Sequence, residues 1–235
     1  MRDFFRETDP LERARLRVVL LTVVVSVVSV SVFAGKSWSD GRTATLLSAI
    51  NAALFAAHIL WYRDAGMARL LLWGLCLGTV ELIADALCVR FTGTLDYSVA
   101  YSAYLAESPW WMPVAWALVG AQIGYLGARF VERVGVLRGA ALSALIGAVN
   151  IPFYEEMAFH AHWWQYQFCR MLPGSHTPIY IVIAELVIGG SLAPLARIAL
   201  RNPRPTVAVA AGAAAGVFTI IGGLVGFGIA EGMLP

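Results

Sequence analysis

Five carboxylates stand within the apolar stretches of this sequence, at spacings that favour acid–base chemistry. Glu81 and Asp85 lie four residues apart in "GTVELIADALCVRF", a spacing that places both on one face of a helix. Glu155 and Glu156 are adjacent in "NIPFYEEMAFHAHWW", and Glu185 interrupts "TPIYIVIAELVIGG". A carboxylate costs about 2.5 to 3.5 kcal/mol on insertion into a membrane, so acids in such stretches indicate function.

Aromatic residues near these acids suggest what the chemistry is. Two buried carboxylates that lie close together hold a shared proton, because two negative charges repel each other in an apolar site. A protonated carboxyl group is a general acid, and desolvated aromatic rings attract cations by up to about 2 kcal/mol each. The nearby residues with which we expect a substrate to make contact are Tyr97, Tyr101, Trp110, Trp111, Trp116, Asn150, Tyr154, Trp164 and Tyr180. We therefore predict carbocation chemistry, begun by protonation of an alkene or epoxide in an apolar isoprenoid.

The helices that must position these residues follow from the hydropathy of the chain. Of its 235 residues 59% are hydrophobic and only 14% are charged, against about 25% charged in soluble domains. Because an unpaired backbone amide in lipid costs several kcal/mol, apolar windows of this length must form helices. The sequence predicts an all-α integral membrane protein with seven transmembrane helices, at about 18–34, 44–62, 68–91, 111–131, 136–154, 178–200 and 206–230.

The positive charges predict how these spans are oriented. Thirteen of the 17 basic residues fall on one side of the predicted spans and four on the other. The positive-inside rule then places the N-terminus in the cytoplasm and the C-terminus outside, and we expect the bacterial cytoplasmic membrane. Residues 1–17 are predicted to form an amphipathic interfacial segment before a seven-helix domain at 18–235.

In this orientation the five acids converge on the outer half of the bundle from three helices. A rise of 1.5 Å per residue places Asp85 roughly 9 Å deep, Glu81 roughly 15 Å and Glu185 about 10 Å. We expect Glu185 or Asp85 to donate the proton and Glu156 to be its partner. Trp111, Trp116, Trp164 and Tyr180 are expected to stabilise the cation. The alternative is structural: Asp85 pairs with Arg90, and Glu155 marks the water boundary.

The remaining parts of the chain predict contacts with lipid and with other helices. The outer connections 92–110 and 155–177 are rich in Tyr and Trp, which is typical of re-entrant or interfacial elements. The small residues of "AVAAGAAAGVFTIIGGLVGFG" predict close packing within the bundle or a homo-oligomer face. No basic patch for nucleic acid is present, and three cysteines without metal-ligand spacing predict no disulfide framework.

One short motif and the overall architecture resemble known membrane cyclases. "PFYEEMAF", at 152–159, resembles the Pro-x-Glu-Glu-x-x-Phe signature of the membrane-integral heterodimer-type lycopene cyclases, with one residue inserted between the proline and the acids. The size, the seven spans and the acids on separate helices resemble the small transmembrane terpene cyclases of fungal meroterpenoid and bacterial indole-terpenoid pathways. These resemblances imply proton-initiated cyclisation that uses carboxylates and needs neither metal nor cofactor.

Other functions remain open at this point. A carotenoid or isoprenoid hydratase would need the same residues. A membrane metalloenzyme would use Glu156 and His160, four residues apart, with His162 and His176 as further ligands. A proton-coupled transporter would use the buried acids as a relay. A retinal protein is excluded, because the single lysine, Lys36, lies outside the spans.

Overall fold

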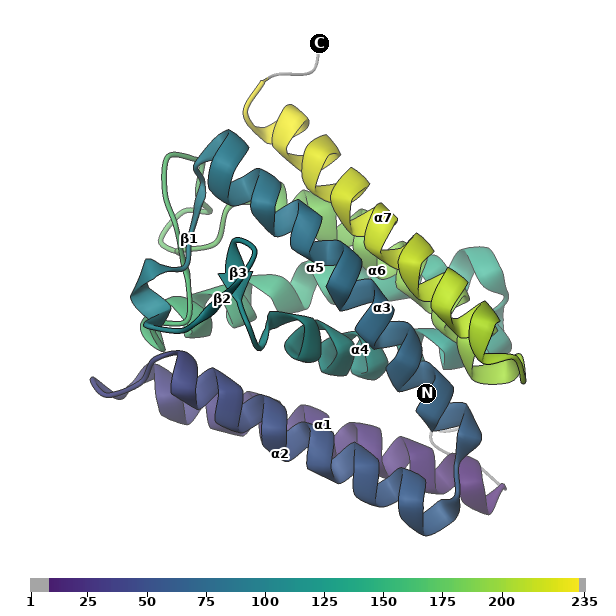
Figure 1. Ribbon diagram of the computed structural model, residues 1–235. Helices are drawn as coiled ribbons and strands as arrows, with labels where there is room; N and C mark the ends of the chain where they lie inside the picture. The colour runs from purple at the N-terminus through teal and green to yellow at the C-terminus, as the bar shows by residue number, and fades with distance from the viewer. Residues whose placement is uncertain (1–8, 233–235) are drawn as a thin grey trace.

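Seven long helices account for most of the chain and determine where the acids lie (Figure 1). The computed structural model describes residues 9–232, and the protein is all-α. The helices are α1(Pro10–Ala34), α2(Gly41–Tyr62), α3(Ala65–Ala86), α4(Met112–Val134), α5(Val136–His160), α6(Ile179–Arg201) and α7(Pro205–Ala230). Each is long and apolar enough to cross a membrane, α3 together with the six residues that follow it. The prediction of an all-α fold with seven apolar helices is confirmed.

Aspartates fix the start of the first three helices. The side chains of Asp9, Asp40 and Asp64 accept hydrogen bonds from backbone amides in the first turns of α1, α2 and α3. Such caps satisfy amides that have no partner inside the helix. α1, α4 and α7 have a proline in the first turn. Proline favours a helix start, since it has no amide hydrogen that would need a partner.

The first helix differs from its sequence prediction. α1 begins at Pro10, so residues 10–17 continue directly into the apolar span as one helix, and their position at the membrane surface stays a prediction. They join the helix because Glu12 and Arg15 are buried in ion pairs within the bundle, which removes their charges from the surface. Residues 1–8 of the predicted segment lie outside the described residues.

Two other helices differ from their predicted ends. α5 passes through Pro152 to His160, six residues beyond the predicted end at residue 154, because Glu155 turns inward and finds partners. α3 itself ends at Ala86, before the predicted end at residue 91, and continues into η2(Leu87–Thr92), a π-helical turn that begins two residues after Asp85. Single π-helical turns are frequent at functional sites.

The helices form two groups. α1 and α2 lie side by side along one face, while α3 and α7 cross the remaining helices diagonally (Figure 1). α6 packs against α4, α5 and α7, and α3 packs against α4 and α7. Small residues make the close packing of α7 possible, since a Cβ added at Gly226 would lie 2.3 Å from the carbonyl oxygen of Tyr180. The predicted packing of α7 within the bundle is confirmed, and a homo-oligomer face stays a prediction.

The two long aromatic connections meet at one end of the bundle, and we call residues 92–111 and 161–178 the loop cap. The strand β1(Leu95–Asp96) pairs antiparallel with β4(Gln165–Tyr166) and joins the two connections. β2(Tyr104–Leu105) pairs with β3(Ser108–Pro109) within the first of them. The loop cap therefore covers the ends of α3, α5 and α6 that carry the acids.

Large apolar side chains point away from the bundle on its described helices. Leu60 and Trp61 of α2, Val24 of α1, Val149 of α5 and Leu224 of α7 are all exposed. An apolar surface this extensive is unusual for a protein in water and matches the interior of a bilayer.

Candidate functional site

A cavity beneath the loop cap collects four of the five acids. Its volume is about 150 Å³, and Glu81 and Asp85 of α3, Glu155 of α5 and Glu185 of α6 line it. All four carboxylates are buried. None of the described residues that line the cavity is an arginine, lysine or histidine. Buried carboxyl groups from three helices thus share one cavity with no basic partner.

Glu81 and Asp85 form a directly interacting pair. Their carboxyl groups are joined by a side-chain hydrogen bond, which requires a proton on one of them. Asp85 Oδ2 also accepts hydrogen bonds from the Tyr97 hydroxyl at 2.7 Å and from Ser108 Oγ at 2.6 Å. Asp85 is surrounded by donors, whereas Glu81 Oε2 has no hydrogen-bond partner among the described residues.

The structure excludes the alternative pairing of Asp85 with an arginine. Arg90 forms its ion pair with Glu107, on the outer side of the loop cap. Burial and the neighbouring Asp85 and Glu81 raise the pKa of Tyr97 well above its usual value. Tyr97 therefore keeps its proton at neutral pH and remains a hydrogen-bond donor to Asp85.

Glu155 receives two donors from the loop cap. Trp164 Nε1 donates to Glu155 Oε2 at 2.5 Å, and the Tyr166 hydroxyl donates to Oε1 at 3.4 Å. The strand pair of β1 and β4 positions Tyr166, and Trp164 directly precedes β4. Glu155 is thus a buried, oriented carboxyl group and no marker of the water boundary.

Glu185 differs from the other three acids because no donor within the described chain contacts its carboxyl group. It faces α5, where a Cβ added at Gly147 would lie 2.9 Å from Glu185 Oε2. A glycine at this position of α5 is what leaves room for the carboxyl group. Glu185 is therefore the most available acid in the cavity.

Aromatic rings form much of the remaining wall. The rings that line the cavity are those of Tyr97, Trp111, Trp116, Tyr154, Trp164, Tyr166 and Tyr180. Trp164 lies between Trp111 and Tyr154, with ring centroids 6.4 Å and 6.2 Å apart respectively. These rings present π faces close to the acids, an arrangement that attracts a cation.

Three predicted site residues do not belong to the cavity. Glu156 points away from it, toward His160 and His176, because consecutive residues of a helix face different directions. Trp110 and Tyr101 are 51% and 86% exposed and do not line the cavity. They belong to outward-facing parts of the loop cap, a placement that aromatic composition alone does not reveal.

Three residues in or beside the cavity were not predicted from the sequence. Ser108 and Tyr166 bond to the acids from the loop cap, and Cys88 lines the cavity from the π-helical turn. Ser108 lies in a loop among several serines, and no spacing rule links it to Asp85. Tyr166 carried a weak signal, because it follows the tryptophan pair at 163–164.

The cavity reaches the side of the bundle at α5. Asn150, predicted to contact substrate, lines the cavity and is itself exposed on the outer face of α5. Gly223 of α7 also lines the cavity, and a Cβ added there would meet nothing within 4 Å. An apolar molecule can therefore approach from the side of the bundle beside Asn150.

A second group of carboxylates lies at the opposite end of the bundle, and we call it the basic-end cluster. Arg15 Nε and Nη2 donate to the two oxygens of Asp64 at 2.7 and 2.5 Å, and Arg15 Nη1 donates to Glu12 at 2.7 Å. Arg201 bonds to Glu12 and makes a two-point contact with Glu132. Every carboxylate of this cluster is paired with an arginine, so its role is structural.

Comparison with known proteins shows one family. Residues 82–230 match DUF6989, which is described as a domain of unknown function. The chain belongs to this family. The DUF6989 match spans α4 to α7 and three of the four cavity acids, and begins one residue after Glu81. No curated protein and no solved structure matches the chain.

Proposed function

We propose that this DUF6989 protein is an integral membrane enzyme that cyclises an apolar isoprenoid through a carbocation, without a metal. The observation that carries this proposal is the single cavity in which four buried carboxyl groups from three helices face aromatic rings and no basic residue. A basic residue would hold the carboxylates in ion pairs, as in the basic-end cluster. Without one, the cavity suits proton transfer and stabilisation of a positive charge.

We propose that the cavity lies in the outer half of a bacterial cytoplasmic membrane. The short connections at 63–64, 135 and 202–204 lie at one end of the bundle and the loop cap lies at the other (Figure 1). By sequence, most of the arginines belong to or adjoin the end with the short connections. The positive-inside rule places the arginine-rich end, and with it the N-terminus, in the cytoplasm. The isoprenoid then enters from the bilayer beside Asn150.

The reaction begins at the Glu81–Asp85 pair. Glu81 transfers its proton to an alkene carbon or an epoxide oxygen of the substrate, which leaves a carbocation on the substrate and adds a second negative charge to the pair. The hydroxyl groups of Tyr97 and Ser108 donate to Asp85 and stabilise the charge that it already carries, while the new charge on Glu81 attracts the cation. A second double bond of the substrate then attacks the cation and closes a ring.

The reaction ends when the carbocation loses a proton to a second carboxyl group. The cation rests against the rings of Trp111, Trp116, Trp164 and Tyr180 until an adjacent carbon loses a proton. Glu185, expected from the sequence as a possible donor, instead takes that proton in its ionised form, because a carboxylate without a donor from the described chain is a strong base. The product has the mass of the substrate, and proton exchange between the carboxyl groups restores the Glu81–Asp85 pair.

The volume of the cavity limits how much of the isoprenoid it can enclose. About 150 Å³ accommodates an apolar group the size of a benzene ring. The cavity therefore encloses the end of the isoprenoid at which a ring forms, and the rest of the chain extends past Asn150 into the lipid.

Mass spectrometry of lipid extracts tests this proposal. Cells that make linear or epoxidised isoprenoids should contain a new product of unchanged mass when they also make the wild-type protein. Glu81→Gln, Asp85→Asn and Glu185→Gln should each lower its formation by about 10²-fold or more, the scale of general acid–base catalysis. Glu107→Gln is the matched control, because this acid lies at the same end of the bundle but pairs with Arg90 outside the cavity.

The alternatives give different products. A gain of one water that depends on the same three carboxyl groups would identify a hydratase, which uses the same cation but ends with water. Full product formation by all three variants would refute acid catalysis in this cavity.

A further inference from the structure

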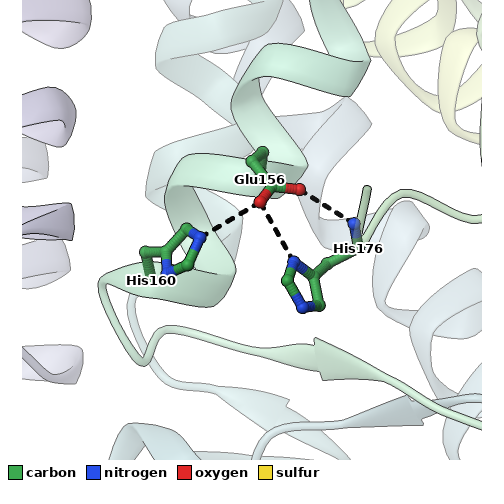
Figure 2. A group of neighbouring side chains, drawn as sticks. All are labelled: Glu156, His160 and His176. Carbon is green, nitrogen blue, oxygen red and sulfur yellow. Dashed lines mark hydrogen bonds and ion pairs between the residues drawn. The ribbon is translucent and has the colours of Figure 1, made fainter. Parts of the chain in front are cut away.

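A cluster of three side chains on the outer face of α5 lies apart from the acid cavity. Figure 2 shows the rings of His160 and His176 directed at the carboxylate of Glu156. Glu156 and His160 lie one turn apart on α5, and His176 belongs to the loop cap just before α6. One ligand atom from each of the three lies within 4.8 Å of the others.

We propose that Glu156, His160 and His176 bind a divalent transition metal ion, Zn²⁺ in the first instance. Glu156 Oε1 lies 3.0 Å from His160 Nε2 and 3.0 Å from His176 Nδ1. Ligand atoms at 2.0 to 2.1 Å from a tetrahedral zinc ion lie about 3.3 Å from each other, so Glu156 Oε1 is already near the required separation from each imidazole, and the two imidazole nitrogens lie within 4.8 Å of each other. Two imidazoles and a carboxylate are ligands that suit zinc and similar ions.

Neighbouring groups hold the ligands in place. The backbone amide of His176 donates to Glu156 Oε2 at 2.8 Å, and Ser175 Oγ donates to the same oxygen at 3.1 Å. These bonds leave Oε1 directed at the two imidazoles. Phe159 stacks on the ring of His176 with centroids 3.6 Å apart and planes 8° apart, which fixes the orientation of that ring. Such outer contacts are typical of metal sites, where they orient the ligands.

The site is accessible to ions from the aqueous phase. The side chains of His160 and His176 are 48% and 44% exposed. Three protein ligands leave a fourth position for water, as in zinc sites that are open to solvent. The metal therefore enters from the surface of the loop cap without passing through the acid cavity.

A metal at this position would link two segments of the chain. It would connect the last turn of α5 to the segment that precedes α6, closing the loop that carries Trp164 and Tyr166. Both residues donate to Glu155, the direct neighbour of Glu156 in the chain. The metal would fix the part of the loop cap that orients Glu155, while the proposed cyclisation needs no metal of its own.

Metal titration of the purified full-length protein tests the site. The chain is purified in detergent without a polyhistidine tag, stripped with chelator and titrated with Co²⁺, whose visible absorption reports a tetrahedral site, and with Zn²⁺ in competition. One equivalent should bind, and His160→Asn or His176→Asn should weaken binding by at least about tenfold. The midpoint of thermal unfolding should rise with Zn²⁺ in the wild type and not in the double variant.

His162→Asn is the matched control. This histidine is exposed in the same loop, and asparagine tolerates its positive φ of 54°. If the control weakens binding as much as the ligand variants, or if the wild type binds no stoichiometric metal, the site does not exist. That outcome would leave the cyclisation proposal standing, because the mass spectrometric test involves none of these residues.

Discussion

The two ends of the bundle treat buried carboxylates in opposite ways. At the basic-end cluster, Asp64 is buried completely and receives a two-point contact from Arg15. In the cavity, Glu185 is nearly as buried but receives no donor from the described chain. Removing one partner from a buried ion pair costs about 3 to 5 kcal/mol, whereas a buried acid without a partner already lowers stability. The first arrangement gives each buried carboxylate a partner that offsets its burial, and the second does not.

The largest effect should follow from breaking the paired end. Asp64→Asn removes one of the two carboxylates that pair with the buried guanidinium of Arg15 and weakens the cap of α3, so the free energy of unfolding should fall by about 3 to 5 kcal/mol. In a protein of this size the midpoint of thermal unfolding should fall by roughly 10 °C. Thermal unfolding in detergent, followed by circular dichroism, measures the change.

The matched substitution at the unpaired end is Glu185→Gln. Its midpoint should stay within about 3 °C of the wild type or rise, because the substitution removes a buried acid that has no ion pair. A fall as large as that of Asp64→Asn would mean that the cavity acids are structural, and the contrast between the two ends would be lost.

A smaller effect should follow from removing one donor in the cavity. Tyr97→Phe keeps the ring but removes the hydroxyl that bonds to Asp85, so product formation should fall about tenfold, equivalent to about 1.4 kcal/mol. The matched control is Tyr101→Phe, since Tyr101 is exposed on the loop cap. Both rates are measured per folded protein, and equal rates in the two variants would show that Tyr97 does not assist the acid pair.

The smallest effect should be a dependence on pH at the paired end. Burial alone would raise the pKa of Asp64, but hydrogen bonds from Arg15, His58 and the amide of Met67 hold it well below the usual 3.8. A carboxylate with a depressed pKa stabilises the fold above the unfolded pKa, and this stabilisation is lost as the pH falls through the folded value. The unfolding midpoint of the wild type should therefore decline below pH 4 more steeply than that of Asp64→Asn. Parallel declines from pH 6 to pH 2.5 would contradict this.

Much of the fold followed from the sequence, because membrane spans are set by length and hydropathy alone. The seven helices were predicted within a few residues at most ends, and their errors share one cause. Pro10–Arg17 and the end of α5 contain charges, which predict exposure to water. Glu12 and Glu155 are instead buried, since each finds partners from distant parts of the chain. Sequence spacing cannot reveal partners that only the tertiary fold brings together.

The site was predictable in part for the same reason. Glu81 and Asp85 share a helix face by their spacing, and the equal depth of Glu185 followed from the helix rise. The sequence did not predict that Glu155 faces the cavity while Glu156 faces away from it, because this depends on how α5 is rotated within the bundle. The loop cap was the least predictable part, since strand pairs of two residues place Tyr166, and Ser108 reaches Asp85 from a connection with no periodic pattern.

Gly223 is a position at which a substitution would change the shape of the cavity without disturbing the packing of the helices. A side chain at Gly147 would collide with Glu185, but one at Gly223 would extend from the wall of α7 without meeting another atom within 4 Å. Alanine, valine or leucine at this position would reduce the space in graded steps while the helices kept their packing. If the proposed cyclisation is correct, such variants should shift the products toward smaller rings, because less space is left for the reacting end of the substrate.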